Sequence, residues 1–123
     1  MSISTDNRTE VLAKNLHFAD ESLTVELVDG RTITVPLSWY PRLVHATQQE
    51  RENWEMLLNG EGFHWPDLNE DLSVDGFIKG RPSGESKRSF ARWLKAKQEG
   101  RGLTIAELNA YDEAQSQSLA QVD

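Results

Sequence analysis

Hydrophobic and polar positions alternate along the first third of the chain with a period of two residues. In SLTVELV (22–28) and RTITVPL (31–37), aliphatic residues occupy every second position and mostly polar ones lie between them. This alternation is typical of strands with one buried face. VLAKNLHF (11–18) is expected to form a preceding strand, and Asp29-Gly30 is a favoured two-residue hairpin turn. The pattern predicts a three-stranded antiparallel meander with one apolar face.

The pattern then changes to short helical signals, which could supply the cover that an apolar sheet face needs. Ser38 is expected to cap a helix that runs through WYPRLVHA. Thr47 and Glu50 have the spacing of a capping box and predict a second short helix, ending near residue 53. Two short strands are then expected to form a hairpin around residues 59–62. Trp54, Met56 and Leu58 fit a strand here, and Trp54, Leu57 and Leu58 fit a helix face equally well.

The end of the chain reads as a linker followed by two helices. GRPSGES (80–86) is rich in Gly, Pro and Ser, as linkers are, and its Ser86 can cap a helix. Gly100 and Gly102 stop this helix, and a second capping box, Thr104 with Glu107, begins another. The second helix is expected to carry a stripe of Ile105, Leu108 and either Tyr111 or Asp112 on its inner face. The final SQSLAQVD is expected to fray.

Together these elements predict an α+β fold. A small domain over residues 1–80 contains the three-stranded meander and the short hairpin, packed with short helices. A two-helix C-terminal extension occupies residues 81–123. The length of 123 residues suits one domain with a small appendage.

Composition indicates the cellular compartment of the protein more clearly than the reaction it could catalyse. The sequence has no Cys, no long apolar run and no basic, apolar leader at its start. A cytoplasmic protein without disulfides, thiolate ligands or a membrane span is therefore expected. We expect no cofactor.

Charge is distributed unevenly between the two parts of the chain. The net charge is −7; residues 1–80 hold 6 Lys/Arg and 14 Asp/Glu, whereas residues 81–123 hold 7 and 6. An acidic domain repels nucleic acid and anionic membranes in general. The basic segment 86–101 is the exception, and it fits either a solvated helix face or a binding surface.

Three motifs in order resemble a known family. VDGRTITVPLSWYPRL, ATQQERENWE and GFHWPDLNEDLSVDGFIKG are similar to the bacterial domain-of-unknown-function 2442 family, over about residues 10–80. The resemblance implies a small α+β domain with no established activity and no catalytic residues to carry over. It also implies a genetic neighbourhood, because members are often encoded beside another small protein in pairs that look like toxin–antitoxin modules. Some relatives carry an extra helix-turn-helix domain.

The stretch GFHWPDLNEDLSVDG (62–76) has some features of a metal site. Oxygen-bearing side chains occupy alternate positions, as in a calcium loop: Asp67, Asn69, Asp71, Ser73 and Asp75. The pattern fails because Leu72 stands where such a loop needs Gly, and Ile78 where it needs Glu. The histidines fall in three separate predicted elements: His17, His45 and His64. No metal site is therefore expected.

We favour a structural interpretation of the same stretch. Pro66 would end a strand, and Ser73 or Asp71 would cap a short helix whose inner face carries Val74, Phe77 and Ile78. The residues in question form a structural turn or a second contact with a partner: His64, Trp65, Asp67 and Asp71. A small metal-dependent or acid–base enzyme is the least favoured alternative, and it would need a cleft that joins His64 to the carboxylates.

The C-terminal extension carries the favoured functional hypothesis. Its first helix has an apolar stripe flanked by cations, and the expected partner-binding residues are Phe90, Trp93, Leu94, Arg88, Arg92 and Lys95. An amphipathic helix beyond a linker suits a groove on another protein. This predicts a non-enzymatic interaction or regulatory protein, antitoxin-like, with a small partner protein. Two alternatives stay open: the helices fold back on the acidic domain, or the protein forms a homodimer.

A nucleic-acid-associated transcriptional regulator is the alternative function. KAKQEGRGLTIAEL resembles the opening of a repressor-type helix-turn-helix, and the helix over residues 86–101 is basic. The following NAYDEAQSQSLAQVD supplies neither a further turn nor a basic recognition helix. Nucleic acid is therefore not the favoured partner.

Overall fold

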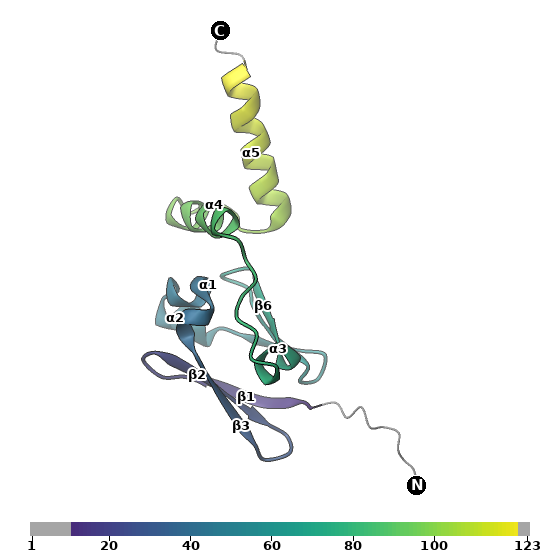
Figure 1. The fold of residues 1–123 in the computed structure, drawn as a ribbon. Coiled ribbons are helices and arrows are strands. Elements are labelled where there is room, and N and C mark those ends of the chain that lie inside the picture. Colours follow the sequence, from purple (N-terminus) through teal and green to yellow (C-terminus); the bar gives the residue numbers. More distant parts are fainter. Residues whose placement is uncertain (1–10, 121–123) are drawn as a thin grey trace. The chain divides into compact units, whose positions relative to one another are not determined.

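The computed structural model describes residues 11–120 of the chain and divides it into two compact units (Figure 1). We call Met1–Gly84 the body and Glu85–Asp123 the helical unit, and each is described by itself. The body contains two antiparallel three-stranded sheets and short helices, so the chain has the predicted α+β fold.

The first sheet is the predicted meander. It pairs β1 (Ala13–Phe18), β2 (Ser22–Leu27) and β3 (Thr32–Pro36) in the order β1-β2-β3. The three aliphatic side chains of β2 are fully buried, and the residues between them are half-buried. The period-two pattern therefore predicted the correct buried face, because successive side chains of a strand point to opposite sides.

The hairpin between β2 and β3 differs from the predicted two-residue turn. The Leu27 N–H donates to the Arg31 carbonyl at 2.8 Å, which leaves the loop with three residues, Val28, Asp29 and Gly30. Gly30 has a φ of 97°, whereas Asp29 does not adopt positive φ. A three-residue loop that ends in a left-handed glycine replaces the turn that would need positive φ at two positions.

The helices after the first sheet are shorter than expected. Ser38 lies inside the 3-10 helix η2 (Leu37–Trp39), so its predicted role as the cap of a longer helix is wrong. Helix α1 (Pro41–Val44) begins at the proline and has no side-chain cap. Helix α2 (Gln48–Glu52) has the predicted capping box. Pro41 can only begin a helix, because it has no N–H to donate within one.

The second sheet has one strand more than the predicted hairpin. It pairs β4 (Glu55–Leu57), β5 (Gly62–Trp65) and β6 (Glu70–Ser73), followed by α3 (Val74–Ile78). The β4–β5 turn also contacts the first sheet, because the Ala13 N–H donates to the Gly60 carbonyl at 2.8 Å. A Cβ at Gly60 would lie 2.6 Å from the Ala13 oxygen, so this close approach requires glycine.

Aromatic rings form the centre of the body. Phe63 of β5 has its ring centroid 5.2 Å from Trp54, 6.2 Å from Trp65 and 6.4 Å from Phe77. Tyr40 meets Phe77 edge-to-face at 5.8 Å. Such contacts add stability beyond the burial of area alone. Helix α2 lies against β1 and α3 against β3.

The helical unit contains α4 (Lys87–Gln98) and α5 (Ile105–Ala120). Ser86 caps α4, and Gly100 follows it with a φ of 71°. The predicted capping box begins α5, with the Thr104 N–H 3.1 Å from Glu107 Oε1. Leu108 is buried but Ile105 is 57% exposed, so the predicted inner position of Ile105 is wrong. Helix α5 extends to Ala120, beyond the predicted start of fraying, and residues 121–123 lie outside the described residues.

Candidate functional site

Two residues of the 62–76 stretch hold the body together. Trp65 is fully buried, and its indole N–H donates to the Arg51 carbonyl at 2.9 Å. Asp67 is exposed and accepts a hydrogen bond from the Asn53 side chain at 2.9 Å. Both contacts connect this stretch to the end of α2, so these two side chains stabilise the fold of the body.

His64 and Asp71 are brought together across neighbouring strands. They are register partners in β5 and β6, and His64 Nδ1 contacts Asp71 Oδ1. The His64 side chain is about one-third exposed and that of Asp71 about two-thirds, so water reaches the pair. The pair also fixes the orientation of the Asp71 carboxylate on the surface of β6.

The end of the stretch forms the expected helix start. The Ser73 hydroxyl accepts from the Gly76 N–H at 3.0 Å, so Ser73, and not Asp71, caps α3. Val74 and Phe77 are buried as predicted, whereas Ile78 is 41% exposed. The prediction of an inward-facing Ile78 is wrong because α3 is one turn long and ends there.

An open cavity of about 400 Å³ lies beside this helix start. Tyr40, β6 residues Glu70 and Asp71, and α3 residue Phe77 line it, and residues 81–84 form one wall. Neither His64 nor Asp67 is among the lining residues. This cavity is therefore not the cleft that an acid–base enzyme would need between His64 and the carboxylates.

Tyr40 is the lining residue that sequence reasoning missed. Its side chain is 2% exposed, and its hydroxyl has no hydrogen-bond partner within the described residues. Burial, and then the nearby charge of Glu70, raise the pKa of Tyr40 to about 12. A tyrosine before a proline gave no signal of this role, because the carboxylates that surround it come 30 residues later in the sequence.

Metal ligands do not converge in the part of the chain that the structure describes. No group of three or more His, Cys, Asp or Glu side chains there could hold an ion. His17 instead lies 3.3 Å from Glu26 on the exposed side of the first sheet. Across residues 11–120, no helix is both long and apolar enough to span a membrane.

The predicted partner-binding stripe of α4 is only partly at the surface. Trp93 is fully buried and stacks on Phe90 with 5.8 Å between ring centroids. Phe90 and Leu94 are half-buried. Trp93 is therefore not an exposed member of the stripe, because its side chain is fully buried.

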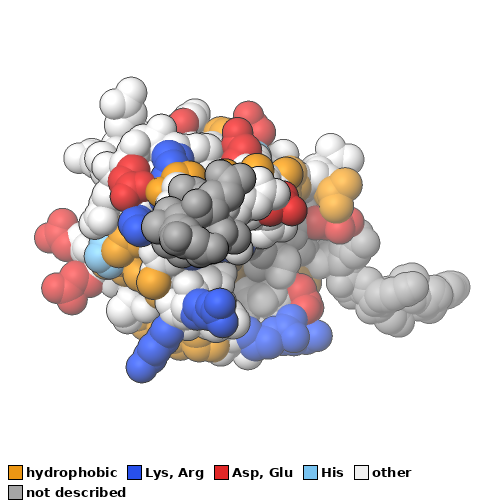
Figure 2. Space-filling model, turned by 90° about the horizontal axis from the view of Figure 1, so that it is seen from above, with side chains coloured by type: hydrophobic (Ala, Val, Ile, Leu, Met, Phe, Trp, Pro, Cys, Tyr) orange, Lys and Arg blue, Asp and Glu red, His pale blue; other side chains and the backbone are white. Residues whose placement is uncertain are grey.

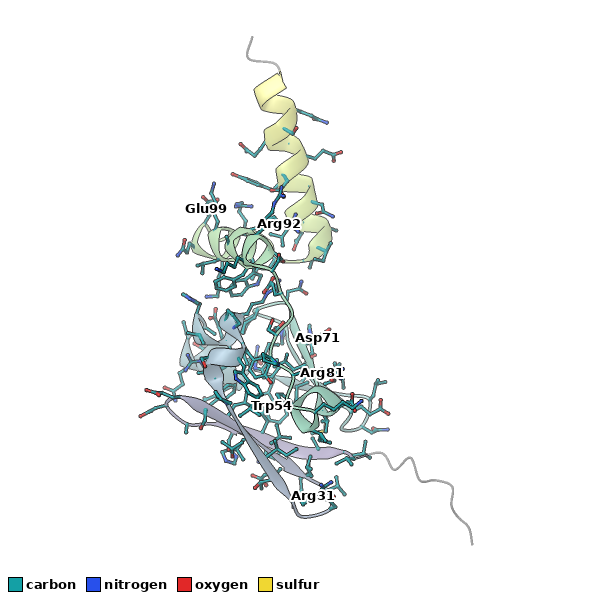
Figure 3. All side chains as sticks on the ribbon, viewed as in Figure 1. Arg31, Trp54, Asp71, Arg81, Arg92 and Glu99 are labelled. Atoms are coloured by element: carbon teal, nitrogen blue, oxygen red, sulfur yellow. The ribbon has the colours of Figure 1, made fainter. Side chains whose placement is uncertain are left out.

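The cations of the helical unit have two different roles. Arg92 donates to Asp112 at 2.8 Å and to Asn109 at 3.1 Å, and so connects α4 to α5 (Figure 3). Arg101 lies 3.4 Å above the centre of the Tyr111 ring. Three other cations of α4 are exposed and make no ion pair with the described residues: Lys87, Arg88 and Lys95. Figure 2 shows Lys and Arg side chains reaching into solvent on the face seen from above.

The fold and this arrangement define a small α+β domain with two three-stranded sheets and an appended helical unit. The chain belongs to the family described as "Protein of unknown function (DUF2442)", which matches residues 13–83. This confirms the resemblance seen in the sequence. The matched segment ends within the wall of the Tyr40 cavity, so it includes nearly all of the body's described residues.

A solved structure has a similar fold. It is the crystal structure of a protein of unknown function from Rhodospirillum rubrum ATCC 11170, and it is 27% identical to this chain with a TM-score of 0.55. The match covers 65% of this chain and 96% of that one. No curated protein matches the chain. The comparisons therefore give the family and the fold of this protein without giving an activity.

Proposed function

We propose that this protein is a non-enzymatic interaction and regulatory protein, the antitoxin-like member of a two-protein module. It binds a small acidic partner protein through the exposed cations of α4. One observation carries the proposal: Lys87, Arg88 and Lys95 are exposed and unpaired within the described residues, although Arg92 and Arg101 of the same unit have acidic or aromatic partners.

The spacing of these cations supports a single binding surface. Arg88 and Lys95 are seven residues apart, and exposed Ala91 lies between them on the same side of α4. Residues three, four and seven apart share a helix face, so the three cations and Ala91 form one cationic surface. We call these four residues the cationic face.

Arg88 and Lys95 keep the binding role predicted from the sequence, whereas the other predicted residues take new roles. Arg92 and Trp93 hold the helical unit together, and half-buried Phe90 and Leu94 flank the cationic face. Exposed cations at the edge of an interface guide the approach and orientation of a partner more than they add affinity. The partner is therefore expected to carry a matching acidic surface.

Affinity purification of the tagged full chain from its native host tests this proposal. The variant Arg88→Glu/Lys95→Glu should lose at least about tenfold of the co-purified partner relative to wild type, because reversal turns attraction into repulsion. Arg88→Lys/Lys95→Arg keeps both charges and is the matched control, which should retain the partner. Mass spectrometry identifies the partner, and the absorbance ratio of the eluate detects nucleic acid.

Three results would overturn the proposal. The reversed variant could retain the partner, which would place the binding surface elsewhere. The eluate could contain the protein alone or as a homodimer. Nucleic acid could elute with a steep salt dependence, which would make the cationic face a phosphate-binding surface and support the transcriptional regulator instead.

A further inference from the structure

The cavity beside Tyr40 combines apolar walls with an excess of negative charge. Leu72 and Phe77 provide apolar surface, and Glu70 and Asp71 provide two carboxylates. Arg81, labelled in Figure 3, also lines the cavity. Its guanidinium donates to Asp75 at 2.8 Å, and Lys79 Nζ lies 3.2 Å from the same carboxylate. The lining itself therefore holds two carboxylates and one guanidinium.

The hydroxyl of Tyr40 is the second, independent feature of this cavity. It is buried without a partner within the described residues, and burial of an unpaired polar group is unfavourable. The ring contacts with Phe77 and Trp39 would be available to phenylalanine as well. Packing within the body therefore explains the aromatic ring at this position and leaves the hydroxyl without a use.

We propose that this cavity binds a small organic cation, an alkyl guanidinium or primary ammonium group, with its aliphatic stem against the apolar walls. The N–H groups of the cation would donate to the Tyr40 hydroxyl oxygen and to Glu70 and Asp71. An ionised carboxylate has about four acceptor positions, so both carboxylates can accept further donors while they keep their present contacts. This site lies in the body and does not depend on the cationic face of α4.

The position of Glu70 explains how the hydroxyl can serve a cationic ligand. Glu70 lines the same cavity, and its charge adds to burial, the larger cause, in raising the pKa of Tyr40. The lone pairs of the phenol oxygen can accept from the ligand, and the nearby negative charge of Glu70 favours a cation there. An anion would instead face both carboxylates, with the single guanidinium of Arg81 to oppose them.

Backbone hydrogen bonds hold the wall made by residues 81–84 against the body. The Ser83 N–H donates to the Trp39 carbonyl at 3.0 Å, and the Arg81 N–H donates to the Gly76 carbonyl at 3.0 Å. Amides in this wall and in the α3 start should therefore report ligand binding directly.

The test is a titration of the ligand-free full chain with agmatine, an alkyl guanidinium that carries no carboxylate. Calorimetry should show saturable binding, and the amides of Ser73, Gly76 and Ser83 should shift in NMR spectra while that of Gly30 does not. Tyr40→Phe should weaken agmatine binding roughly five- to tenfold, the effect of one lost hydrogen bond. The same variant without ligand should melt at the wild-type temperature or above it.

Two controls separate the ligand site from general effects. Tyr111→Phe makes the same chemical change in the helical unit and should leave agmatine binding unchanged. A blocked peptide with one arginine distinguishes the source of the guanidinium. Binding at least about tenfold tighter than that of agmatine assigns the cavity to a side chain of a partner, and weaker binding assigns it to a free small molecule.

The proposal would be overturned by any of three results. Agmatine could fail to bind saturably up to about 10 mM, an upper limit for weak specific sites. Tyr40→Phe could bind agmatine as tightly as wild type does. Inorganic phosphate or acetate could bind in place of agmatine, which would show that Arg81 and not the carboxylates determines the ligand.

Discussion

The body and the helical unit differ in how much apolar surface each buries. The body encloses four large aromatic side chains, Tyr40, Phe63, Trp65 and Phe77, beside the aliphatic face of its first sheet. In the helical unit, the buried side chains among the described residues are Trp93, Ala96 and Leu108. Small cores give little stability of their own. The body is therefore expected to fold by itself, whereas the helical unit depends on polar contacts and gains most from a partner.

The largest effect should follow from loss of the central ring of the body. Phe63→Ala removes a fully buried side chain that contacts three other aromatic rings, and should cost about 3–5 kcal/mol of unfolding free energy. Urea unfolding followed by near-UV circular dichroism measures this. Phe63→Leu is the milder control. An unchanged unfolding transition for Phe63→Ala would show that the aromatic cluster is not the core of the body.

A comparable truncation in the helical unit should act locally. Trp93→Ala should lower the unfolding free energy of that unit by about 3 kcal/mol or more. This loss exceeds the stability that the small core of the helical unit can supply. Helical circular dichroism at 222 nm should fall, while the near-UV signal of the body and the shift dispersion of its amides stay. Simultaneous loss of both signals would contradict separate stabilisation of the two regions.

The two tyrosines of the chain allow a comparison at alkaline pH. The pKa of Tyr40 is raised from 10.0 to about 12, so the native body keeps a proton that the unfolded chain has lost between these values. The stabilising contribution is fully present below pH 10 and is lost as the pH rises through 12. Absorbance at 295 nm should show a step near pH 12 that Tyr40→Phe removes and Tyr111→Phe keeps.

The two capping boxes provide a matched pair with a smaller effect. Thr47→Ala and Thr104→Ala each remove a hydroxyl that accepts a backbone N–H at 3.1 Å, and each should cost about 1 kcal/mol. In the body this loss should lower the global unfolding free energy. In the helical unit it should appear as faster amide exchange at the start of α5. Identical global effects of both variants would argue against a separately stabilised helical unit.

Acid should produce the smallest effect, at the start of α5. The backbone N–H of Thr104, and then its hydroxyl, lower the pKa of Glu107. The contribution of this carboxylate is present above its unfolded pKa near 4.5 and is lost as the pH falls through the lowered folded value. The Thr104 amide shift should follow this titration in NMR spectra, and Glu107→Gln should abolish it. A midpoint at or above 4.5 would disprove the capping contact.

Local chemistry in the sequence predicted the elements of both regions well. Alternation indicated the buried face of β2, and the spacing of Thr47 with Glu50 and of Thr104 with Glu107 indicated two helix starts. These signals work because each depends on residues within a few positions of one another. The predicted length of the β2–β3 loop was wrong by one residue, because the same Asp-Gly pair fits loops of two or three residues.

Features built from distant segments could not be predicted. Strand β6 has no apolar alternation, because half of it lies toward solvent beside the cavity. The Tyr40 cavity joins residues from positions 40, 70 and 81, and burial of Trp93 depends on tertiary packing around α4. A stripe at helical spacing shows which side of a helix is apolar, but not whether that side is already covered.

Hydrogen exchange of the free chain and of its purified complex is the decisive comparison between the body and the helical unit. We expect slow exchange in β5 in both states, and fast exchange along residues 109–117 of α5 in the free chain. Partner binding should slow exchange in α4 and α5 and leave β5 unchanged. Two results would contradict the claim that a partner stabilises the helical unit. Residues 109–117 could exchange as slowly as β5 in the free chain, or the partner could slow exchange in the body alone.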